Sequence, residues 1–427
     1  MKINGIFQEY EMGDLLNAFS ASTPIDWQYI AEGALNLALT YKGKDSQLNG
    51  YVLRVRKLNP EASGSSDNPW AESLKFGDSV VVPLLGRRYV QPAVEASLPQ
   101  GFMEYLATLI ENDRPEKRRL HPLDTSLKTA LLMLDNTQIP DGEGPSICFE
   151  LKVKCGFIPS ECPFITHDVK KRVDRFTMHQ TLKYSSGKLD TLSRYSPVEL
   201  FSYDKIRVAN VLDYLVATPQ NNFRMFVNGS MVYPDENGHG SPEAFKGVVE
   251  AHNIPGGADS LLDVLSDIFI KEPLLDRIRS FQMMDDCDIE GTWPVYEQIA
   301  ARGETLSPLS GPVRPRNLPT CLPTTKDEQH ELVNRFLLSC TGKDCSTMIA
   351  MKPHLDASGL EAPSLARLPV ELDGPRTIVA HKGFLFSTAV VDLDPKPIEK
   401  MEYYFKEDRK IALFYAQLES QGKLPFQ

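Results

Sequence analysis

The sequence contains 427 residues, of which 42% are hydrophobic and 24% are charged, and its formal net charge is −11. A chain of this length exceeds the usual size of a single hydrophobic core, so we expect two or more lobes. The acidic balance argues against general attraction to nucleic acid or to a membrane surface, so an anion-binding site would have to be a local basic pocket.

The cysteines and the apolar runs indicate the compartment. The seven cysteines are an odd number without a close Cys-x-x-Cys pair, which favours reduced thiols in the cytoplasm or the nucleus. The first 25 residues are polar and acidic and do not resemble a signal peptide. Because the sequence has no run of 18 apolar residues, we expect no transmembrane helix.

The first part of the chain predicts a small sheet. A short amphipathic helix is expected within residues 11–19, and alternating apolar residues predict a strand over 35–41 that forms a hairpin with a strand over 51–57. Gly33, at the start of the first strand, would let the backbone approach a phosphate, although a plain strand entry is the commoner explanation. Arg54, on the second strand, either reaches phosphates or lies on a solvated face.

The following segments alternate between loops and buried elements. The pattern predicts a loop over 59–75, a strand or another short buried element over 79–86, a helix over 102–112 and a buried strand over 129–135. A connector rich in Gly, Pro and Asp then predicts a boundary between an N-terminal lobe, residues 1–136, and a C-terminal lobe, residues 137–427.

The sequence SICFELKVKCGF, residues 146–157, predicts a strand with two different faces. Glu150, Lys152 and Lys154 would lie on one face, with the two lysines about 7 Å apart. Such lysines repel each other unless an anion lies over them. The stretch is therefore either an exposed edge or part of an anion site.

The rest of the chain predicts mainly helices. They are expected over 167–183, which is strongly basic, and over 205–216, 259–285, 326–339 and 406–417, with strands over 346–351 and 384–391. Thr325 and Glu328 have the spacing of a capping box. A mobile Pro- and Ser-rich loop is expected over 302–325, and another loop over 356–374.

Asn221 and Asn222 are followed closely by Arg224. Two amides and a guanidinium suit the binding of phosphate or hydroxyl groups, although an Asn pair more often marks a turn.

Asp392 and Asp394 follow the last predicted strand at positions i and i+2. On an extended chain this spacing places both carboxylates on the same side, roughly 6–7 Å apart at their Cα atoms. Hard oxygen ligands at the end of a core strand suit a magnesium-binding site, and magnesium usually also binds substrate phosphates. Because Lys396 and Lys400 follow as partners for anions, the segment suggests phosphoryl transfer. The alternative is a charged turn after a buried strand.

Seven motifs, taken together and in order, resemble those of the inositol-pentakisphosphate 2-kinases, the enzymes that make inositol hexakisphosphate (phytate). The motifs are ELKVKCGF (150–157), RFTMHQTLK (175–183), RYSPVELFS (194–202), PQNNFRMFVNG (219–229), DIEG (288–291), KDCSTMIA (343–350) and DLDPKP (392–397). The resemblance extends from about residue 26 to residue 417.

The resemblance implies an α+β, two-lobed, protein-kinase-like fold. The smaller N-terminal lobe would carry an antiparallel sheet, the larger C-terminal lobe would be α/β and hold the inositol-phosphate site, and ATP would bind between the lobes. The implied reaction is ATP-dependent phosphorylation of the 2-hydroxyl of inositol 1,3,4,5,6-pentakisphosphate. The implied cofactors are ATP and Mg²⁺.

The resemblance also assigns residues to roles. Asp344 would take the proton of the 2-hydroxyl, Lys152 would act in catalysis as well as in binding, and Asp392 with Asp394 would hold magnesium. Nucleotide contacts are implied for Gly33, Ala34, Leu35, Asn36, Arg54, Asp135, Asn136, Thr137, Glu150, Arg224 and Asp392. Substrate contacts are implied for Arg114, Lys152, Lys154, Lys183, Asn221, Asn222, Lys396, Lys400 and Tyr404.

Two other functions compete with this one. The chain could be a non-catalytic scaffold that binds inositol polyphosphates on a degenerate kinase fold, but the presence of Glu150, Lys152, Asp344 and Asp392 weighs against it. It could be a kinase of another polyphosphate or of a protein, but the sequence lacks the HRD and DFG strings of protein kinases. We expect a monomer in the cytoplasm or the nucleus, with no nucleic-acid or membrane partner.

Overall fold

The computed structural model describes residues 4–33, 35–58, 70–139, 144–306, 309, 313–354 and 379–425, with side chains from residue 13 onward. The chain forms two compact units. The first unit comprises Met1–Lys75 with Gln91–Pro140, and the second comprises Phe76–Val90 with Asp141–Gln427. Helices and antiparallel strands occur in both, which confirms the expected α+β class.

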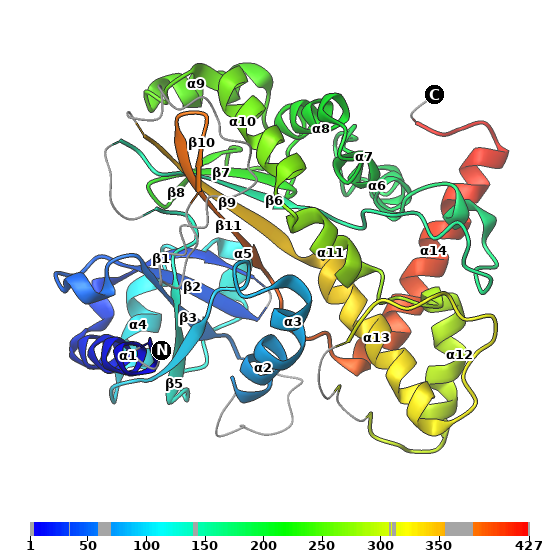
Figure 1. Cartoon of the computed structure of the whole chain (residues 1–427), viewed down its shortest axis with the longest axis horizontal. Coiled ribbons are helices and arrows are strands. Elements are labelled where there is room, and N and C mark those ends of the chain that lie inside the picture. Colours follow the sequence, from blue (N-terminus) through cyan, green and yellow to red (C-terminus); the bar gives the residue numbers. More distant parts are fainter. Residues whose placement is uncertain are drawn as a thin grey trace. The chain divides into compact units, whose positions relative to one another are not determined.

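The first unit contains a five-stranded antiparallel sheet (Figure 1). Its strands, in spatial order, are β1 (Trp27–Glu32), β2 (Asn36–Tyr41), β3 (Tyr51–Arg56), β5 (Thr129–Leu134) and β4 (Ala93–Ser97). Its helices are α1 (Asn4–Ala21), α4 (Phe102–Ile110) and α5 (Glu116–Arg119). Apolar side chains of α1, α4 and the strands form one core. The predicted hairpin is confirmed as β2 and β3, whereas β1 was not predicted.

The segment over 79–86 forms the buried helical element that the sequence left as an alternative to a strand. A π-helical turn, Gly77–Val81, continues into α3 (Val82–Leu85). Pro83 occupies the first turn of α3, where a missing N–H is tolerated. Residues 356–374 and most of 59–75 lie outside the described residues, and the described end of the latter segment begins α2 (Ala71–Phe76).

The second unit is built on a six-stranded antiparallel sheet. Its strands, in spatial order, are β10 (Val379–His381), β11 (Phe384–Val391), β9 (Ser346–Pro353), β6 (Ile147–Lys152), β7 (Phe223–Val227) and β8 (Ser230–Tyr233). One face packs on four helices to form the largest core, and Phe149 stacks on Phe223 within it with ring centroids 5.6 Å apart. These helices are α8 (Lys205–Ala217), α9 (Pro242–Ala251), α10 (Gly257–Lys271) and α11 (Leu274–Gln282).

The remaining helices of the second unit pack beside this layer. They are α6 (Arg175–Ser185), α7 (Pro197–Leu200), α12 (Asp288–Ala301), α13 (Lys326–Asp344) and α14 (Met401–Ser420). The predicted helix over 167–183 is interrupted, because Asp174 caps α6 by accepting a hydrogen bond from the Thr177 N–H. The predicted capping box of α13 does not form, since the Thr325 hydroxyl donates to Glu328 instead of accepting from the backbone. Part of the predicted 302–325 loop lies outside the described residues.

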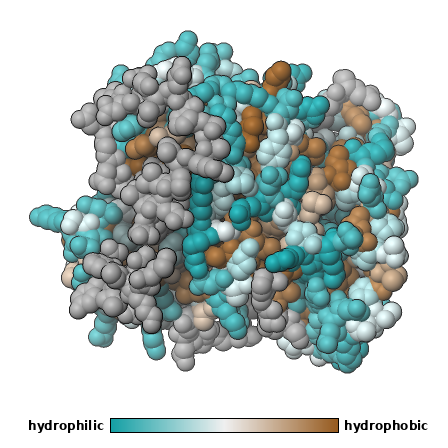
Figure 2. Space-filling model, in the orientation of Figure 1, coloured by the Kyte–Doolittle hydropathy of each residue, from teal (hydrophilic) through white to brown (hydrophobic). Residues whose placement is uncertain are grey.

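Hydrophilic and hydrophobic residues are interspersed on the face drawn in Figure 2. Among the helices that the structure describes, none combines the length and the hydropathy needed to cross a bilayer.

A buried ion pair joins α13 to the turn before α12, and we expect the second unit to depend on it. Arg335 and Asp286 are almost fully buried, with Arg335 Nη2 2.8 Å from Asp286 Oδ1 and Arg316 Nε 2.8 Å from Oδ2. Asp286→Ala would leave a buried guanidinium without its carboxylate, so urea denaturation should show a loss of about 3–5 kcal/mol. Lys406→Ala, which removes an exposed pair with Glu402, should cost less than about 1 kcal/mol. Equal losses would contradict this account.

Candidate active site

The sheet face opposite the four helices gathers four polar side chains at one end. The antiparallel register places Lys152 of β6 opposite Ser346 of β9, and Glu150 opposite Arg224 of β7. Lys152 Nζ lies 3.1 Å from Ser346 Oγ and 3.2 Å from Asp392 Oδ2. The Ser346 hydroxyl is 3.2 Å from Glu150 Oε1, and Arg224 Nη1 is 2.9 Å from Glu150 Oε2. Five residues from four segments that are distant in sequence therefore form one hydrogen-bonded cluster.

Asp392 does not continue the extended strand. The expectation that an extended chain places its carboxylate on the same side as that of Asp394 is therefore wrong. Strand β11 ends at Val391, and Asp392 has a φ of +63°. This left-handed residue breaks the two-residue alternation of side chains. Asp392 is exposed and turns toward Lys152, whereas the backbone carbonyl of Asp394 accepts a hydrogen bond from the Thr341 hydroxyl at 3.2 Å.

Asp344 is the last residue of α13, which continues five residues beyond its predicted end. Lys396 Nζ donates to Asp344 Oδ2 at 2.8 Å. Desolvation by the surrounding protein raises the pKa of this carboxyl, but the ammonium groups of Lys396, Lys154 and Lys152 outweigh it and hold the pKa below its usual value. Asp344 is therefore ionised at neutral pH.

Lys154 lies beyond the end of the strand. Strand β6 ends at Lys152, and Lys154 has a φ of +55°. The prediction that Glu150, Lys152 and Lys154 share one strand face is therefore confirmed for the first two residues and wrong for Lys154. Burial lowers the pKa of Lys154 to about 8, and repulsion by Lys152 and Lys183 adds to this while Asp344 opposes it.

Helix α6 adds further positive charge. Arg175, His179 and Lys183 follow at four-residue spacing and so share one helix face. Burial, followed by the repulsion of Lys183, Arg175 and Lys154, lowers the pKa of His179 to about 3. Burial is also the main cause that lowers the pKa of Lys183. Carboxylates balance only part of the positive charge around His179. A bound polyanion would reduce the remaining repulsion among these cations.

The other predicted substrate residues of the second unit lie in different settings. Asn222 is buried, its backbone carbonyl accepts from the Lys152 N–H at 2.9 Å, and its Oδ1 has no partner among the described residues. Asn221 and Lys400 are exposed. Tyr404 is half-buried beside Phe336, and burial raises its pKa well above the usual value.

The predicted nucleotide loop belongs to the first unit. The Gly33 N–H donates to the Asn36 carbonyl at 2.9 Å, which closes a tight turn between β1 and β2. The Gly33 carbonyl accepts from Lys57 Nζ at 2.5 Å, and Leu35 is half exposed. Ala34 lies outside the described residues. Arg54 lies on β3, where it is half-buried opposite Ala38 of β2.

Arg114 lies in a buried ion triplet of the first unit. Its Nε lies 3.0 Å from Glu32 Oε1 and its Nη2 lies 3.0 Å from Glu32 Oε2. Lys57 Nζ is 2.7 Å from the same carboxylate. All three side chains are at least 98% buried. Desolvation raises the pKa of Glu32, but its hydrogen bonds to Arg114 and Lys57 bring it below the usual value.

The predicted hinge forms a hydrogen-bonded turn. The buried carboxylate of Asp135 accepts from the Thr137 N–H at 2.8 Å and from Gln138 Nε2 at 2.6 Å. This Asx turn shapes the backbone over Asp135, Asn136 and Thr137.

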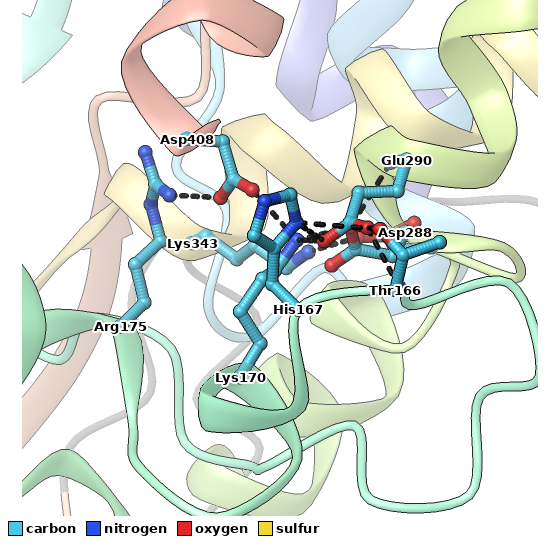
Figure 3. A network of polar contacts seen from close by, with 9 residues as sticks. Thr166, His167, Lys170, Arg175, Asp288, Glu290, Lys343 and Asp408 are labelled. Atoms are coloured by element: carbon cyan, nitrogen blue, oxygen red, sulfur yellow. Dashed lines mark hydrogen bonds and ion pairs between the residues drawn. The ribbon is translucent and has the colours of Figure 1, made fainter. Parts of the chain in front are cut away.

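A second polar cluster was not predicted as a site. Asp288, Glu290 and Asp408 are close enough to share one cation, but Lys170 already lies among them (Figure 3). Its Nζ is 2.6 Å from Asp408 and 3.1 Å from Glu290, and it also pairs with Asp288. Burial lowers the pKa of Lys170, but the carboxylates raise it well above the usual value. The ammonium group therefore serves as the cation that joins the turn over Asp168–Lys171 to α12 and α14.

The sequence reasoning missed two residues, Ser346 of the first cluster and His179 of the α6 face. His179 could have been found from the four-residue spacing that it shares with Arg175 and Lys183. Ser346 could not, because a serine at the start of a strand carries no signal of its own.

Comparison with known proteins gives a consistent result. A family model described as inositol-pentakisphosphate 2-kinase matches residues 29–410. An Oryza sativa subsp. japonica protein named inositol-pentakisphosphate 2-kinase IPK1 is 30% identical over 424 residues, which cover 91% of this chain and 93% of that protein. The inositol-pentakisphosphate 2-kinases of Arabidopsis thaliana and Danio rerio are 30% and 27% identical, with the same coverage.

The lowered pKa of Lys154 predicts an unusually reactive amine. Limited acetylation across a pH series, quantified by mass spectrometry, should give a titration midpoint near pH 8 for Lys154, because the neutral amine is the reactive form. Lys183→Met should move the midpoint upward, since it removes a repelling charge. A lysine model peptide titrated in the same way is the reference, with a midpoint near the ordinary lysine value of about 10.4. The same midpoint for Lys154 and the peptide would refute the assignment.

Proposed function

The chain belongs to the inositol-pentakisphosphate 2-kinase family, and from this premise we propose that it transfers the γ-phosphoryl group of ATP to the 2-hydroxyl of inositol 1,3,4,5,6-pentakisphosphate. The product is inositol hexakisphosphate. The observation that carries the proposal is the excess of cations around Lys154, His179 and Lys183 next to the ionised carboxylate of Asp344. A scaffold without activity would need the cations but not the carboxylate.

The substrate carries five phosphates, and its binding would reverse the repulsion among the lysines. A phosphate beside Lys154 favours its charged form, as Asp344 already does in part. Asn222 would add an amide donor, since its Nδ2 donates one N–H to Gln220 Oε1 at 3.2 Å and has a second N–H for a phosphate oxygen. The full set of proposed substrate residues is Arg114, Lys152, Lys154, Lys183, Asn221, Asn222, Lys396, Lys400 and Tyr404.

The proposed ATP contacts draw on both units, as in protein kinases, with ATP between an N-terminal lobe, residues 1–136, and a C-terminal lobe, residues 137–427. In the first unit they are the Gly33–Asn36 turn, Arg54 and the Asp135–Thr137 turn. In the second they are Glu150 and Arg224, whose mutual ion pair is 2.9 Å long. Gly33 supports the proposal, because a residue without a side chain lets a phosphate approach the backbone.

The oxygen ligands at the end of the sheet fit magnesium. Asp392 is an exposed carboxylate with the Ser346 hydroxyl 3.4 Å from its Oδ2, and hard oxygen atoms are the ligands that Mg²⁺ prefers. Asp392 would hold the ion, and Asp394 remains a second candidate. Bound Mg²⁺ would neutralise phosphate charge during transfer.

Within this proposal Asp344 accepts the proton of the attacking 2-hydroxyl. Its pKa is held below the usual carboxyl value, so the basic form is present at neutral pH. The Lys152 ammonium, which now contacts Asp392 and Ser346, would stabilise negative charge on the transferring phosphoryl group. Positioning and charge neutralisation therefore provide most of the catalysis.

The compartment and the oligomeric state complete the proposal. All seven cysteines are unpaired in the structure, which is consistent with the cytoplasm or the nucleus, and the chain would act as a monomer.

Asp344→Asn should abolish transfer without abolishing binding. We expect a fall in kcat of about 10²–10⁴-fold, measured as hexakisphosphate on anion-exchange chromatography, because the variant lacks the base. Titration calorimetry should still detect pentakisphosphate binding. Asp213→Asn, on the exposed face of α8, is the control and should keep full activity. Full activity of Asp344→Asn would remove the base assignment, and inactivity of the parent protein with intact binding would favour the scaffold.

Asp392→Asn should raise the Mg²⁺ concentration that gives half-maximal activity by at least tenfold, because it removes a charged ligand. The same titration of Asp394→Asn decides whether the second carboxylate takes part. A Mg²⁺ dependence of Asp392→Asn that matches the parent protein would exclude Asp392 as the ligand.

A further inference from the structure

Gln282, the last residue of α11, is fully buried and uses its whole carboxamide. Its Nε2 donates to the carbonyl of Lys154 at 2.6 Å and to the carbonyl of Gly342 at 3.1 Å. Its Oε1 accepts from the N–H of Gly156 at 2.9 Å. One side chain therefore joins the segment that follows β6 to the last turn of α13, against which α11 packs (Figure 1).

The backbone groups that Gln282 contacts lie where the regular hydrogen bonding of β6 and α13 ends. Strand β6 ends at Lys152 and Lys154 is left-handed, so the Lys154 carbonyl and the Gly156 N–H lie beyond the sheet ladder. Gly342 lies in the last turn of α13, where the final four carbonyls lack helical partners. Buried backbone groups of this kind need a partner, and the carboxamide supplies one to each of the three. The Gly342 carbonyl also accepts a weaker hydrogen bond from the Cys345 thiol at 3.3 Å.

Close packing limits how these segments could otherwise move. A Cβ at Gly156 would lie 2.3 Å from the ring of Phe201, and a Cβ at Gly342 would lie 3.0 Å from the ring of Phe281. Arg279, also on α11, donates to the Gly156 carbonyl at 3.3 Å. The end of α11 thus fits between the two segments with little free space.

The two joined segments carry proposed functional groups. Lys154 belongs to the first segment, and Asp344 follows Gly342 by two residues in the second. The Lys154 ammonium helps to lower the pKa of Asp344, and the Asp344 carboxylate opposes the lowering of the Lys154 pKa, so the two groups act on each other electrostatically. Their separation depends on how the turn after β6 is held against the end of α13.

We propose that Gln282 is a positioning residue for phosphoryl transfer, which fixes the substrate-binding Lys154 and the base Asp344 relative to each other through their backbones. This role rests on the proposed function, because it gives those two residues their tasks. It assigns Gln282 no contact with substrate, ATP or metal. Its loss would leave every reacting group present but misaligned, which lowers kcat.

The test is Gln282→Leu, which has a similar size but cannot form hydrogen bonds. With Mg²⁺, ATP and inositol 1,3,4,5,6-pentakisphosphate, we expect kcat to fall at least tenfold. In the absence of substrate, the acetylation midpoint of Lys154 should move from near pH 8 toward the ordinary lysine value, because the freed segment lets the amine reach water. This second readout needs no activity, so it tests the positioning even if the proposed reaction is wrong.

Gln329→Leu is the matched control. Gln329 is also buried, lies near the other end of α13, and joins segments through three hydrogen bonds to Arg302, Gln298 and Pro323 at 2.9–3.3 Å. It should lower stability comparably but leave kcat and the Lys154 midpoint unchanged. An equal effect of both variants would reduce Gln282 to a general structural role.

Gln282→Asn covers the case in which the leucine variant does not fold. It keeps the uncharged carboxamide but is one methylene shorter, so it cannot reach all three backbone groups and smaller changes of the same sign are expected. Parental kcat together with a Lys154 midpoint near pH 8 in the folded variant would overturn the proposal.

Discussion

The antiparallel register of β6, β9 and β11 decides which side chains meet on the face of the second sheet that lies opposite the helices. Lys152 lies opposite Ser346, and Ser346 lies opposite Val391, so the ends of three distant segments meet at one point. A slip of one residue would turn Glu150 and Lys152 into the helix-covered core, where ions without partners are costly. Apolar packing on one face therefore fixes the polar arrangement on the other.

The balance of charge separates the candidate site from the structural ion clusters. Around Lys170 three carboxylates surround one ammonium group, and they raise its pKa. Around Lys154 the nearest lysines outnumber the carboxylates, and its pKa falls to about 8. An anionic ligand beside Lys154 would stabilise the folded chain, because it offsets the repulsion between the lysines. Lys170 needs no such ligand, because its charge is already balanced by carboxylates. Arg114 resembles the first case, because its guanidinium already forms a bidentate pair with Glu32. A phosphate that binds Arg114 would have to replace this carboxylate.

Membership of the inositol-pentakisphosphate 2-kinase family is consistent with this charge pattern in an acidic protein. The net charge of −11 keeps the surface as a whole unattractive to polyanions, while basic residues are concentrated on α6 and at the ends of strands. Burial strengthens their effect, since charges interact more strongly where water is excluded.

Local patterns in the sequence predicted many of the strands and helices, and the roles of the site residues stay predictions. An apolar, partly β-branched run predicted β11 over 384–391, alternation predicted the two faces of β6 up to Lys152, and α8 was predicted to within one residue. The motifs identified the family, because they record residue types in order and need no geometry. Only the tertiary structure decided the left-handed turns at Lys154 and Asp392, the helical form of 77–85 and the roles of Ser346, Lys170 and Gln282. Periodicity reports which side of an element is buried, but the path of the chain after the element ends is set by partners far away in sequence.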